Sequence, residues 1–575
     1  MSTISERQQR VMEAFTQDQF TTLERVETYQ DGLGICVSSA APIGDSPAKR
    51  KKAYYIDGDP HTLGYLMGRL AEPEIARMCD EFVENIVFAF LKIPNLDLFK
   101  LMKALLENIS QHGIADLPLE LRQEVQGMLE GCRSVNPGTV VDLDSLWALN
   151  VGIDVLLSSL YCGKLPLPFQ ADASKVRALA RGHKDQLFHI PIACNGFVIS
   201  GVRPETQAPY HYMGRDFMFP TADVFQDTAA VIIRKPAQGC ATVSVAAPGM
   251  IGSIAGVNEN GVGVGVDILP AANADADRPG FNSLPLARWS IEAGGDYEAA
   301  LEVMVQAQRG VPWIYLLADG STGLSGIVEA GKKTAGPDFW AYVEPWAKKV
   351  LLAVNPHFTD LLQTPSTLFR DGLMARRADY QYPRVYQDSD FNRELIKEYN
   401  RRALWTYHYG YDPADFGETG YLNHAPHDGG KPWTIAHCPG PFYFAPPRRP
   451  LPSGVMVTNH AIIPEMRLYG MSTQIENLVG GTFDDIQWRY DQLHAELLTR
   501  LQPGSLSKDD ARAAIDFLAP SGSFPKYYNK GGEADLRKVQ VHGAVALIDL
   551  KEKSLQAHYG YYADEWVNLC LPNYL

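Results

Sequence analysis

The chain lacks the features that mark disulfide-bonded secreted proteins and membrane proteins. It has 575 residues but only 8 cysteines, and none of them form a Cys-x-x-Cys pair. Such sparse cysteines do not make a disulfide scaffold and fit a reducing compartment. The first ten residues are polar and contain no apolar core of a signal peptide. The apolar stretches at 82–91 and 149–160 are shorter than the roughly 20 residues that a spanning helix needs. We therefore expect a cytoplasmic protein that is not a membrane protein.

The chain also has fewer basic than acidic residues. The chain carries 52 lysines and arginines against 67 acidic residues, which gives a formal net charge of −15. A nucleic-acid surface needs a basic face, so this composition argues against a nucleic-acid partner. Hydrophobic residues at 46% and charged residues at 21% are normal for a globular protein. The length exceeds one ordinary core, so we expect at least two domains.

The periodicity of apolar residues changes along the chain. Residues 1–162 show mainly helical spacing and are expected to form a helical pro-region. Prolines followed by a charged run at 163–193 predict a linker. The rest, 194–575, alternates strand-like segments with helix pairs and contains an aromatic, proline-rich insertion at 356–450. This order predicts an α+β fold in which helices cover antiparallel sheets.

Cys194 is the strongest candidate for a reactive group. It follows the linker directly and begins an apolar segment, Asn-Gly-Phe-Val-Ile-Ser-Gly, that is typical of a strand. Most single cysteines are small buried hydrophobic residues, so position is what distinguishes this one. If the bond between Ala193 and Cys194 were cut, the new α-amine would have a pKa of about 7.7–8.0. One residue would then supply both the nucleophile and its base.

Arg215 and Asp216 lie on the next strand-like segment. On sequence alone such a pair is usually a surface or packing ion pair. Beside Cys194, the guanidinium would stabilise a thiolate, and the acid would hold the α-ammonium or orient the arginine.

Two further residues are candidates in combination with Cys194. Asn459 ends an apolar strand and is either a turn residue or an amide donor to an oxyanion. Arg489 is most simply a helix surface residue that pairs with Asp485, and it becomes a site residue only together with the others.

The order of these segments resembles a known family. A cysteine at the head of a strand is followed by Gly-Arg-Asp-Phe at 214–217, by Gly-Val-Asn-Glu-Asn-Gly-Val at 256–262, by Thr-Asn-His at 458–460 and by Gln-Trp-Arg-Tyr at 487–490. This series is similar to the acyl-coenzyme A:6-aminopenicillanic acid acyltransferase family of the N-terminal nucleophile hydrolases. The helical stretch before Cys194 also resembles that family's pro-region.

The resemblance implies a four-layer αββα sandwich and self-cleavage of the Ala193–Cys194 bond. It implies an acyl-enzyme thioester on Cys194, with Asn459 in the oxyanion hole and no cofactor. The partners expected are a small acyl substrate, with acyl-coenzyme A as one option, and a homo-oligomer or a heterodimer of the cleavage products. The family's strand motif carries an acid where this chain has Met218, so Asp216 is assigned the role of the acid.

Two other interpretations of the function remain open. The imperfect motif around Met218 suits a catalytically silent binding or scaffold relative of the same fold. His424, His427 and His437 offer ligands for a metal-dependent hydrolase, although a proline lies between the first two and no acidic partner is obviously placed. We therefore assign no metal site.

Overall fold

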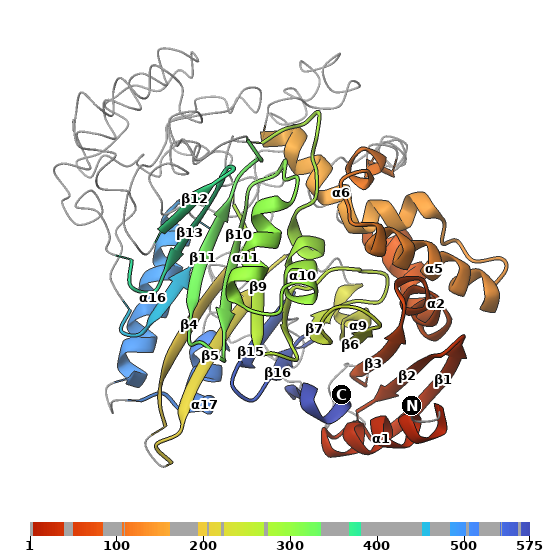
Figure 1. Cartoon of the computed structure of the whole chain (residues 1–575), viewed down its shortest axis with the longest axis horizontal. Coiled ribbons are helices and arrows are strands. Elements are labelled where there is room, and N and C mark those ends of the chain that lie inside the picture. The colour runs from red at the N-terminus through yellow and green to blue at the C-terminus, as the bar shows by residue number, and fades with distance from the viewer. Residues whose placement is uncertain are drawn as a thin grey trace, which may run out of the picture.

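The computed structural model describes the greater part of the chain. The described residues are 4–39, 50–83, 106–107, 110–161, 194–203, 206–219, 224–269, 274–334, 367–380, 451–459, 483–501, 505–516, 541, 543–561 and 565–575. They form an α+β fold built on two large sheets, here called sheet A and sheet B (Figure 1).

Within the described residues, sheet A has eleven strands. In spatial order they are β1 (Thr22–Tyr29), β2 (Gly32–Ser38), β3 (Lys52–Gly58), β6 (Ala230–Pro236), β7 (Thr242–Ala246), β8 (Ala255–Asn258), β9 (Val262–Ile268), β10 (Trp313–Asp319), β11 (Ser325–Ala330), β13 (Leu373–Arg377) and β12 (Thr367–Arg370). Neighbours run antiparallel except β3 and β6, which are parallel. This parallel pair joins the segment before Cys194 to the segment after it.

Sheet B, as far as the structure describes it, has six antiparallel strands. Their spatial order is β14 (Gly454–Val457), β4 (Cys194–Val202), β5 (Pro209–Phe217), β15 (Ala544–Asp549), β16 (Ser554–His558) and β17 (Val567–Cys570). The strand-like segments that carry Cys194 and Arg215 do form strands, and β4 and β5 pair as an antiparallel hairpin that begins at Cys194. Both lie in the middle of the sheet, where neighbouring strands fix their position on each side.

The helices pack on both sheets. They are α1 (Ile4–Gln17), α2 (Pro60–Arg77), η1 (Met78–Phe82), α5 (Leu119–Val135), α6 (Leu143–Tyr161), α9 (Phe225–Thr228), α10 (Ser283–Ala293), α11 (Tyr297–Gln306), α16 (Phe483–Leu501), α17 (Lys508–Asp516) and η6 (Leu571–Tyr574). Helix α10 packs on β8 and β9 and α11 on β10, whereas α17 packs on β5 and β15 and α16 on β14. Strands of the two sheets contact each other directly, for example β4 with β9 and β10.

The alternation along β9 shows how its sequence builds the space between the sheets. A Cβ at Gly263 would meet Leu550 and Met213, and one at Gly265 would meet Arg215, so these positions face sheet B. The valines between them point to the opposite face, on which α10 packs. Gly263 and Gly265 of β9 therefore let large side chains of sheet B enter the interior.

Helices α2 and α5 pack unusually closely. Cβ atoms added to Gly64 and Gly68 of α2 would lie 1.8 and 2.2 Å from backbone oxygens of α5, and those added to Gly127 and Gly131 would lie 2.1 Å from backbone oxygens of α2. Helix α2 begins with Asp59 as its cap, since the Asp59 carboxylate accepts a hydrogen bond from the Thr62 amide.

The segment before Cys194 is less helical than expected. Strands β1–β3 occupy much of the stretch from Thr22 to Gly58 and extend sheet A. The apolar runs of these strands are short and lie close together. The helical spacing in the rest of the segment therefore led to a helical prediction for the whole of it. Within the predicted insertion at 356–450, the described residues 367–380 contain the hairpin β12–β13, which also extends sheet A. The remaining insertion residues lie outside the described parts of the chain.

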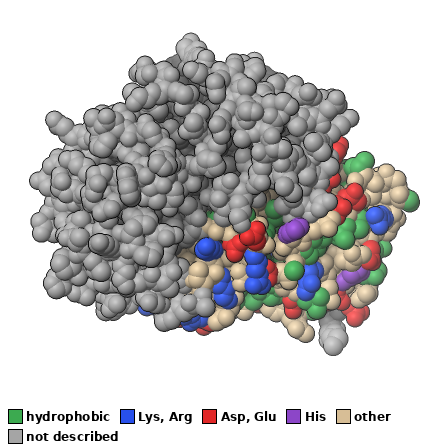
Figure 2. Space-filling model, turned by 90° about the horizontal axis from the view of Figure 1, so that it is seen from above, with side chains coloured by type: hydrophobic (Ala, Val, Ile, Leu, Met, Phe, Trp, Pro, Cys, Tyr) green, Lys and Arg blue, Asp and Glu red, His purple; other side chains and the backbone are tan. Residues whose placement is uncertain are grey.

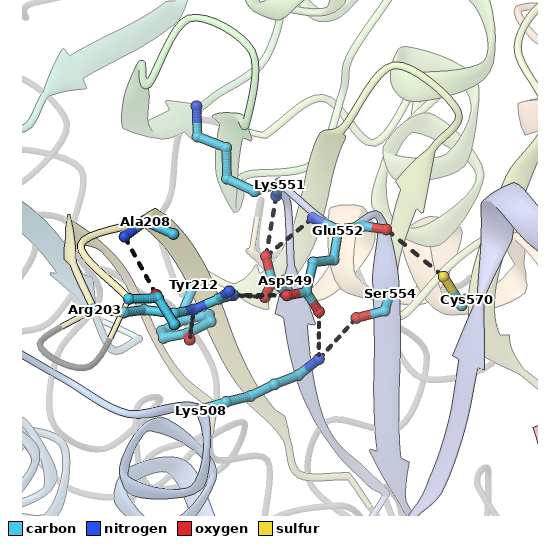
Figure 3. A network of polar contacts seen from close by, with 10 residues as sticks. Arg203, Ala208, Tyr212, Lys508, Asp549, Lys551, Glu552, Ser554 and Cys570 are labelled. Atoms are coloured by element: carbon cyan, nitrogen blue, oxygen red, sulfur yellow. Dashed lines mark hydrogen bonds and ion pairs between the residues drawn. The ribbon is translucent and has the colours of Figure 1, made fainter.

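Ion pairs fix the far end of the β4–β5 hairpin (Figure 3). Nη2 of Arg203 lies 2.8 Å from a carboxylate oxygen of Asp549 and 2.8 Å from one of Glu552. On the other side, the Lys508 ammonium of α17 donates to Ser554 at 2.9 Å. These contacts attach the hairpin and α17 to the turn between β15 and β16. On the described part of the face in Figure 2, side chains of both charges lie side by side.

Candidate active site

Cys194 is the first residue of β4 and is fully buried. Strand β4 lies between β14 and β5, so the segments that carry Asn459 and Arg215 flank it on both sides. Helix α16 brings Arg489 to the same place. The structure therefore gathers Cys194 and Arg215 from the consecutive strands β4 and β5, and Asn459 and Arg489 from two segments much later in the sequence.

The backbone of Cys194 is held by two of these residues. Its nitrogen donates a hydrogen bond to Oδ1 of Asn459 at 2.9 Å. Arg489 donates from Nη1 to the Cys194 carbonyl at 2.8 Å and from Nη2 to Oδ1 of Asn459 at 3.1 Å. The interpretation of Arg489 as a helix surface residue is wrong, because its side chain is fully buried against Cys194.

Asn459 uses both ends of its amide. Its Nδ2 donates to the carbonyl of Ile268 at 3.1 Å, while Oδ1 accepts from Cys194 and Arg489. An amide nitrogen has two hydrogens, so one of them is engaged by Ile268 and a second is left over. The role of Asn459 as an oxyanion donor needs that second hydrogen and stays a prediction.

The sulfur of Cys194 lies on the face of β4 that points to sheet A. Gly196 pairs with Arg215 and Cys194 with Phe217, so all four positions share that face. Arg215 crosses to sheet A and forms a fully buried ion pair with Asp267 of β9. Burial raises the pKa of the Cys194 thiol, the charge of Arg215 lowers it, and the charge of Asp267 raises it.

Asp216 lies on the other face of β5. Its Oδ2 accepts from Nδ2 of Asn195 at 3.3 Å, and the groups that act on its charge include Arg489. Burial raises its pKa to about 7, and the nearby Arg215 charge opposes that rise. Arg215 and Asp216 therefore do not form the side-chain pair beside the thiol that the sequence suggested, because successive residues of a strand point to opposite faces.

Asn195 was missed by the sequence analysis. Its Oδ1 accepts from Nη1 of Arg489 at 2.6 Å, and its backbone carbonyl accepts from Nη1 of Arg215 at 2.8 Å. Asn195 also donates to the Asp216 carboxylate, so it links Arg215, Arg489 and Asp216. Its place directly after Cys194 was the only signal in the sequence.

Asp267 was missed as well. It ends a run of valines and glycines in β9, and a carboxylate on such a buried strand needs a partner. That lone charge was the signal, but the partner Arg215 lies on another sheet and cannot be found by spacing. Burial raises the pKa of Asp267 to about 6, and the Arg215 charge opposes the rise.

Several predicted residues lie outside the described parts of the chain. They are Ala193, the linker 163–193, and His424, His427 and His437. Within the described ranges, no group of three or more histidine, cysteine and acidic side chains is arranged to hold a metal ion. None of the described helices is both long enough and apolar enough to cross a membrane.

Comparison with known proteins gives a relative without an assigned function. No protein-family model matches the chain. A protein of Archaeoglobus fulgidus, described as "Uncharacterized protein", is 26% identical to it over 518 residues, which are 90% of this chain. The match covers 65% of the archaeal protein, so this chain spans less than two thirds of that relative's length.

Proposed function

We propose that the protein is a self-processing cysteine N-terminal nucleophile enzyme, either an amidohydrolase or an acyltransferase. It would form an acyl-enzyme thioester on Cys194 with a small acyl-amide or acyl-thioester substrate. One observation carries this proposal: separate polar groups engage the nitrogen, the carbonyl and the sulfur side of the same residue. Asn459 and Arg489 hold the backbone, and Arg215 faces the sulfur side.

The arrangement of layers supports the same proposal. Helices α10 and α11 pack on sheet A, α16 and α17 pack on sheet B, and the two sheets contact each other. This packing supports the αββα sandwich that the resemblance implies. The nucleophile at the head of a central strand, between two strands that supply site residues, also fits that fold.

Self-processing would come first. The Cys194 sulfur attacks the carbonyl carbon of Ala193, the C–N bond breaks, and the nitrogen of Cys194 takes the thiol proton. Water then hydrolyses the resulting thioester, which leaves a carboxylate at residue 193 and a free thiol and amine at Cys194. The contacts from Asn459 and Arg489 would hold the Cys194 backbone in place during both steps.

Turnover would use the new amine as the base. The amine accepts the proton of the thiol, and the thiolate attacks the acyl carbon of the substrate. The ammonium returns the proton to the leaving group as the thioester forms. Attack by water then gives hydrolysis, and attack by an amine or thiol gives acyl transfer. Arg215 would stabilise the thiolate, and the second Nδ2 hydrogen of Asn459 would stabilise the oxyanion.

An intact mass spectrum of the purified protein tests the proposal. The wild type is expected as two chains, one ending at residue 193 and one beginning at Cys194. The Cys194→Ala variant is expected to stay whole and to show no turnover. Cys36→Ala is the matched control, since Cys36 is also a buried free cysteine on a strand but lies in sheet A away from the site. Processing of Cys194→Ala at the wild-type rate would refute the assignment.

A catalytically silent relative of the same fold is the second candidate. It is favoured by the complete burial of the thiol and by the separation of Asp216 from it. A silent relative would stay whole as the wild type, so the same mass spectrum separates the two proposals.

A further inference from the structure

Asp267 and Arg215 form a fully buried ion pair on the sulfur side of the proposed nucleophile. The Arg215 side chain comes from β5 of sheet B, and the Asp267 side chain comes from β9 of sheet A. Neither side chain is exposed to solvent. Arg215 and Asp267 are the charged groups with the largest effect on the Cys194 thiol. Arg489 of α16 donates to the Cys194 carbonyl, and its charge acts on Asp267 and on Asp216 of β5.

The strand β9 is built to accept Arg215. A Cβ at Gly265 would lie 2.7 Å from Cδ of Arg215, closer than the two atoms can approach without a shift. The arginine stem therefore crosses the interior over a position where only glycine fits without a shift. The guanidinium also donates to the carbonyl of Val266, next to Asp267. Two neighbouring positions of β9 thus hold the head of the arginine, and a third makes room for its stem.

Asp216 does not take this place. Arg215 contacts the backbone carbonyl of Asp216, while the Asp216 carboxylate is turned to Asn195 on the opposite face. The carboxylate that pairs with Arg215 beside the sulfur is therefore that of Asp267, which belongs to sheet A.

We infer that Asp267 is a positioning residue of the active site, which holds Arg215 against the sulfur side of Cys194 and balances its charge there. The inference rests on the proposed role of Cys194 as the nucleophile. An unbalanced guanidinium beside a thiol favours the thiolate, and a nearby carboxylate reduces that effect. Asp267 therefore keeps the sulfur from ionising as readily as Arg215 alone would make it.

The test is the pH profile of Cys194 alkylation in the folded full-length chain. Iodoacetamide labelling of the peptide that contains Cys194 is measured by mass spectrometry from about pH 5 to about pH 10, a range that covers ordinary thiol titration. Asp267→Asn is expected to lower the midpoint by about one pH unit, because Arg215 is left without its counter-charge. Glu124→Gln is the matched control, since it also removes a buried carboxylate from an arginine and is expected to keep the wild-type midpoint.

Three results would overturn the inference. One is an unchanged midpoint in Asp267→Asn, and another is an equal shift in Glu124→Gln. The third is a Cys194 that stays unlabelled at every pH while the partly exposed Cys570 in the same sample reacts. If Asp267→Asn does not fold, Arg215→Gln is compared with Arg215→Gln/Asp267→Asn. The double variant is expected to have the lower midpoint, and equal midpoints would overturn the inference.

Failure of the inference and failure of the proposed function are distinguishable. Labelling needs no turnover, so a chain that stays whole but shows the shifted midpoint contradicts the proposed function alone. If the chain is cut at residue 193 but Asp267→Asn leaves the midpoint of Cys194 alkylation unchanged, only the role of Asp267 is contradicted.

Discussion

Two groups of buried polar residues hold this molecule together, and they are built differently. One surrounds Cys194. The other, which we call the helix joint, connects helices α5 and α6 of the segment before Cys194 to α10 and sheet A after it. Its members are Glu124, Asn150, Asp154, Arg234, Ser283, Arg288, Glu292 and Trp313.

In the helix joint, polar groups from one segment meet polar groups of the other. Glu124 lies 2.6 Å from Arg288 and 3.4 Å from Arg234. Asp154 accepts from Ser283 at 2.7 Å and from the Trp313 indole at 2.8 Å. The contacts are spread over several elements and converge on no thiol, which is what a structural connection between segments requires.

Around Cys194 the contacts converge instead. Asn459, Arg489 and Arg215 come from three segments and all engage one residue, and two acids lie behind them on opposite faces. Buried charge alone therefore does not identify a site in this fold. Convergence on one residue, the proposed nucleophile Cys194, is the difference, and variants that affect stability and rate separately test it.

Glu124→Gln is expected to give the largest loss of stability. Removing one partner of a buried ion pair typically costs about 3–5 kcal/mol, because the other charge is left in the interior. Burial, with the Arg288 charge nearby, already lowers the pKa of Arg234 to about 10, so this arginine depends on its acidic neighbours. Urea unfolding measures the effect, in the Cys194→Ala background so that processing does not alter the transition.

Glu130→Gln is the control for that measurement. Glu130 lies on the same helix α5 but is half exposed and pairs with His61 at the surface, so its loss is expected to cost less than about 1 kcal/mol. In a chain with Cys194 present, Glu124→Gln should still be processed. A Glu124→Gln protein as stable as Glu130→Gln would show that the joint does not secure the segment.

Asn459→Ala is expected to act mainly on rate. Loss of one oxyanion donor typically lowers the rate about 100- to 1,000-fold, and Asn459 also holds the Cys194 nitrogen. The measurement is the rate of processing by intact mass and the rate of turnover once a substrate is known.

Asn150→Ala is the matched variant in the helix joint. Its amide bridges the Gly249 carbonyl and the Ile251 nitrogen, both at 2.8 Å, so, like Asn459, it uses both its oxygen and its nitrogen in bonds to other segments. It is expected to lower stability and to leave the rate of the folded protein unchanged. The distinction between site and joint fails if both alanine variants slow processing equally.

Much of the fold after Cys194 could be predicted from the sequence. The Asn-Gly step within 256–262 is typical of a hairpin turn and joins β8 to β9, and one of the helix pairs expected after Cys194 is α10 and α11. Local turn residues and regular apolar spacing determine such elements. Strands β1–β3 escaped because their place in sheet A depends on β6, which lies more than a hundred residues away.

The site was predictable only in part, for the same reason. Cys194, Asn459 and Arg489 could be proposed because each lies in a segment that resembles the family, and the structure brings them together. Asp267 could not, because its partner is determined by how the two sheets face each other. Adjacency in sequence suggested Asp216 instead, although alternation along β5 points it away from Arg215.

The smallest effect we predict is a change in how stability depends on pH. Burial raises the pKa of Asp154 to about 7, against the lowering effect of its bonds to Ser283 and Trp313. An unfolded aspartate titrates near about 3.9. Between these values the folded chain binds a proton that the unfolded chain does not, so Asp154 makes stability fall as pH rises through that window. The slope from one proton is at most about 1.4 kcal/mol per pH unit.

Asp154→Asn should remove this contribution, because the amide is neutral at every pH and still accepts from the Trp313 indole. Urea unfolding at about pH 5 and about pH 8, on either side of the folded pKa, is the measurement. The variant should lose less stability than its parent between the two, and Asp216 and Asp267, whose pKa values are also raised, should keep the remaining slope. An identical slope in variant and parent would mean that Asp154 titrates alike in the folded and unfolded chains. The Asp154 carboxylate would then be ionised throughout this pH range, and Ser283 and Trp313 would donate their hydrogen bonds to a charged acceptor.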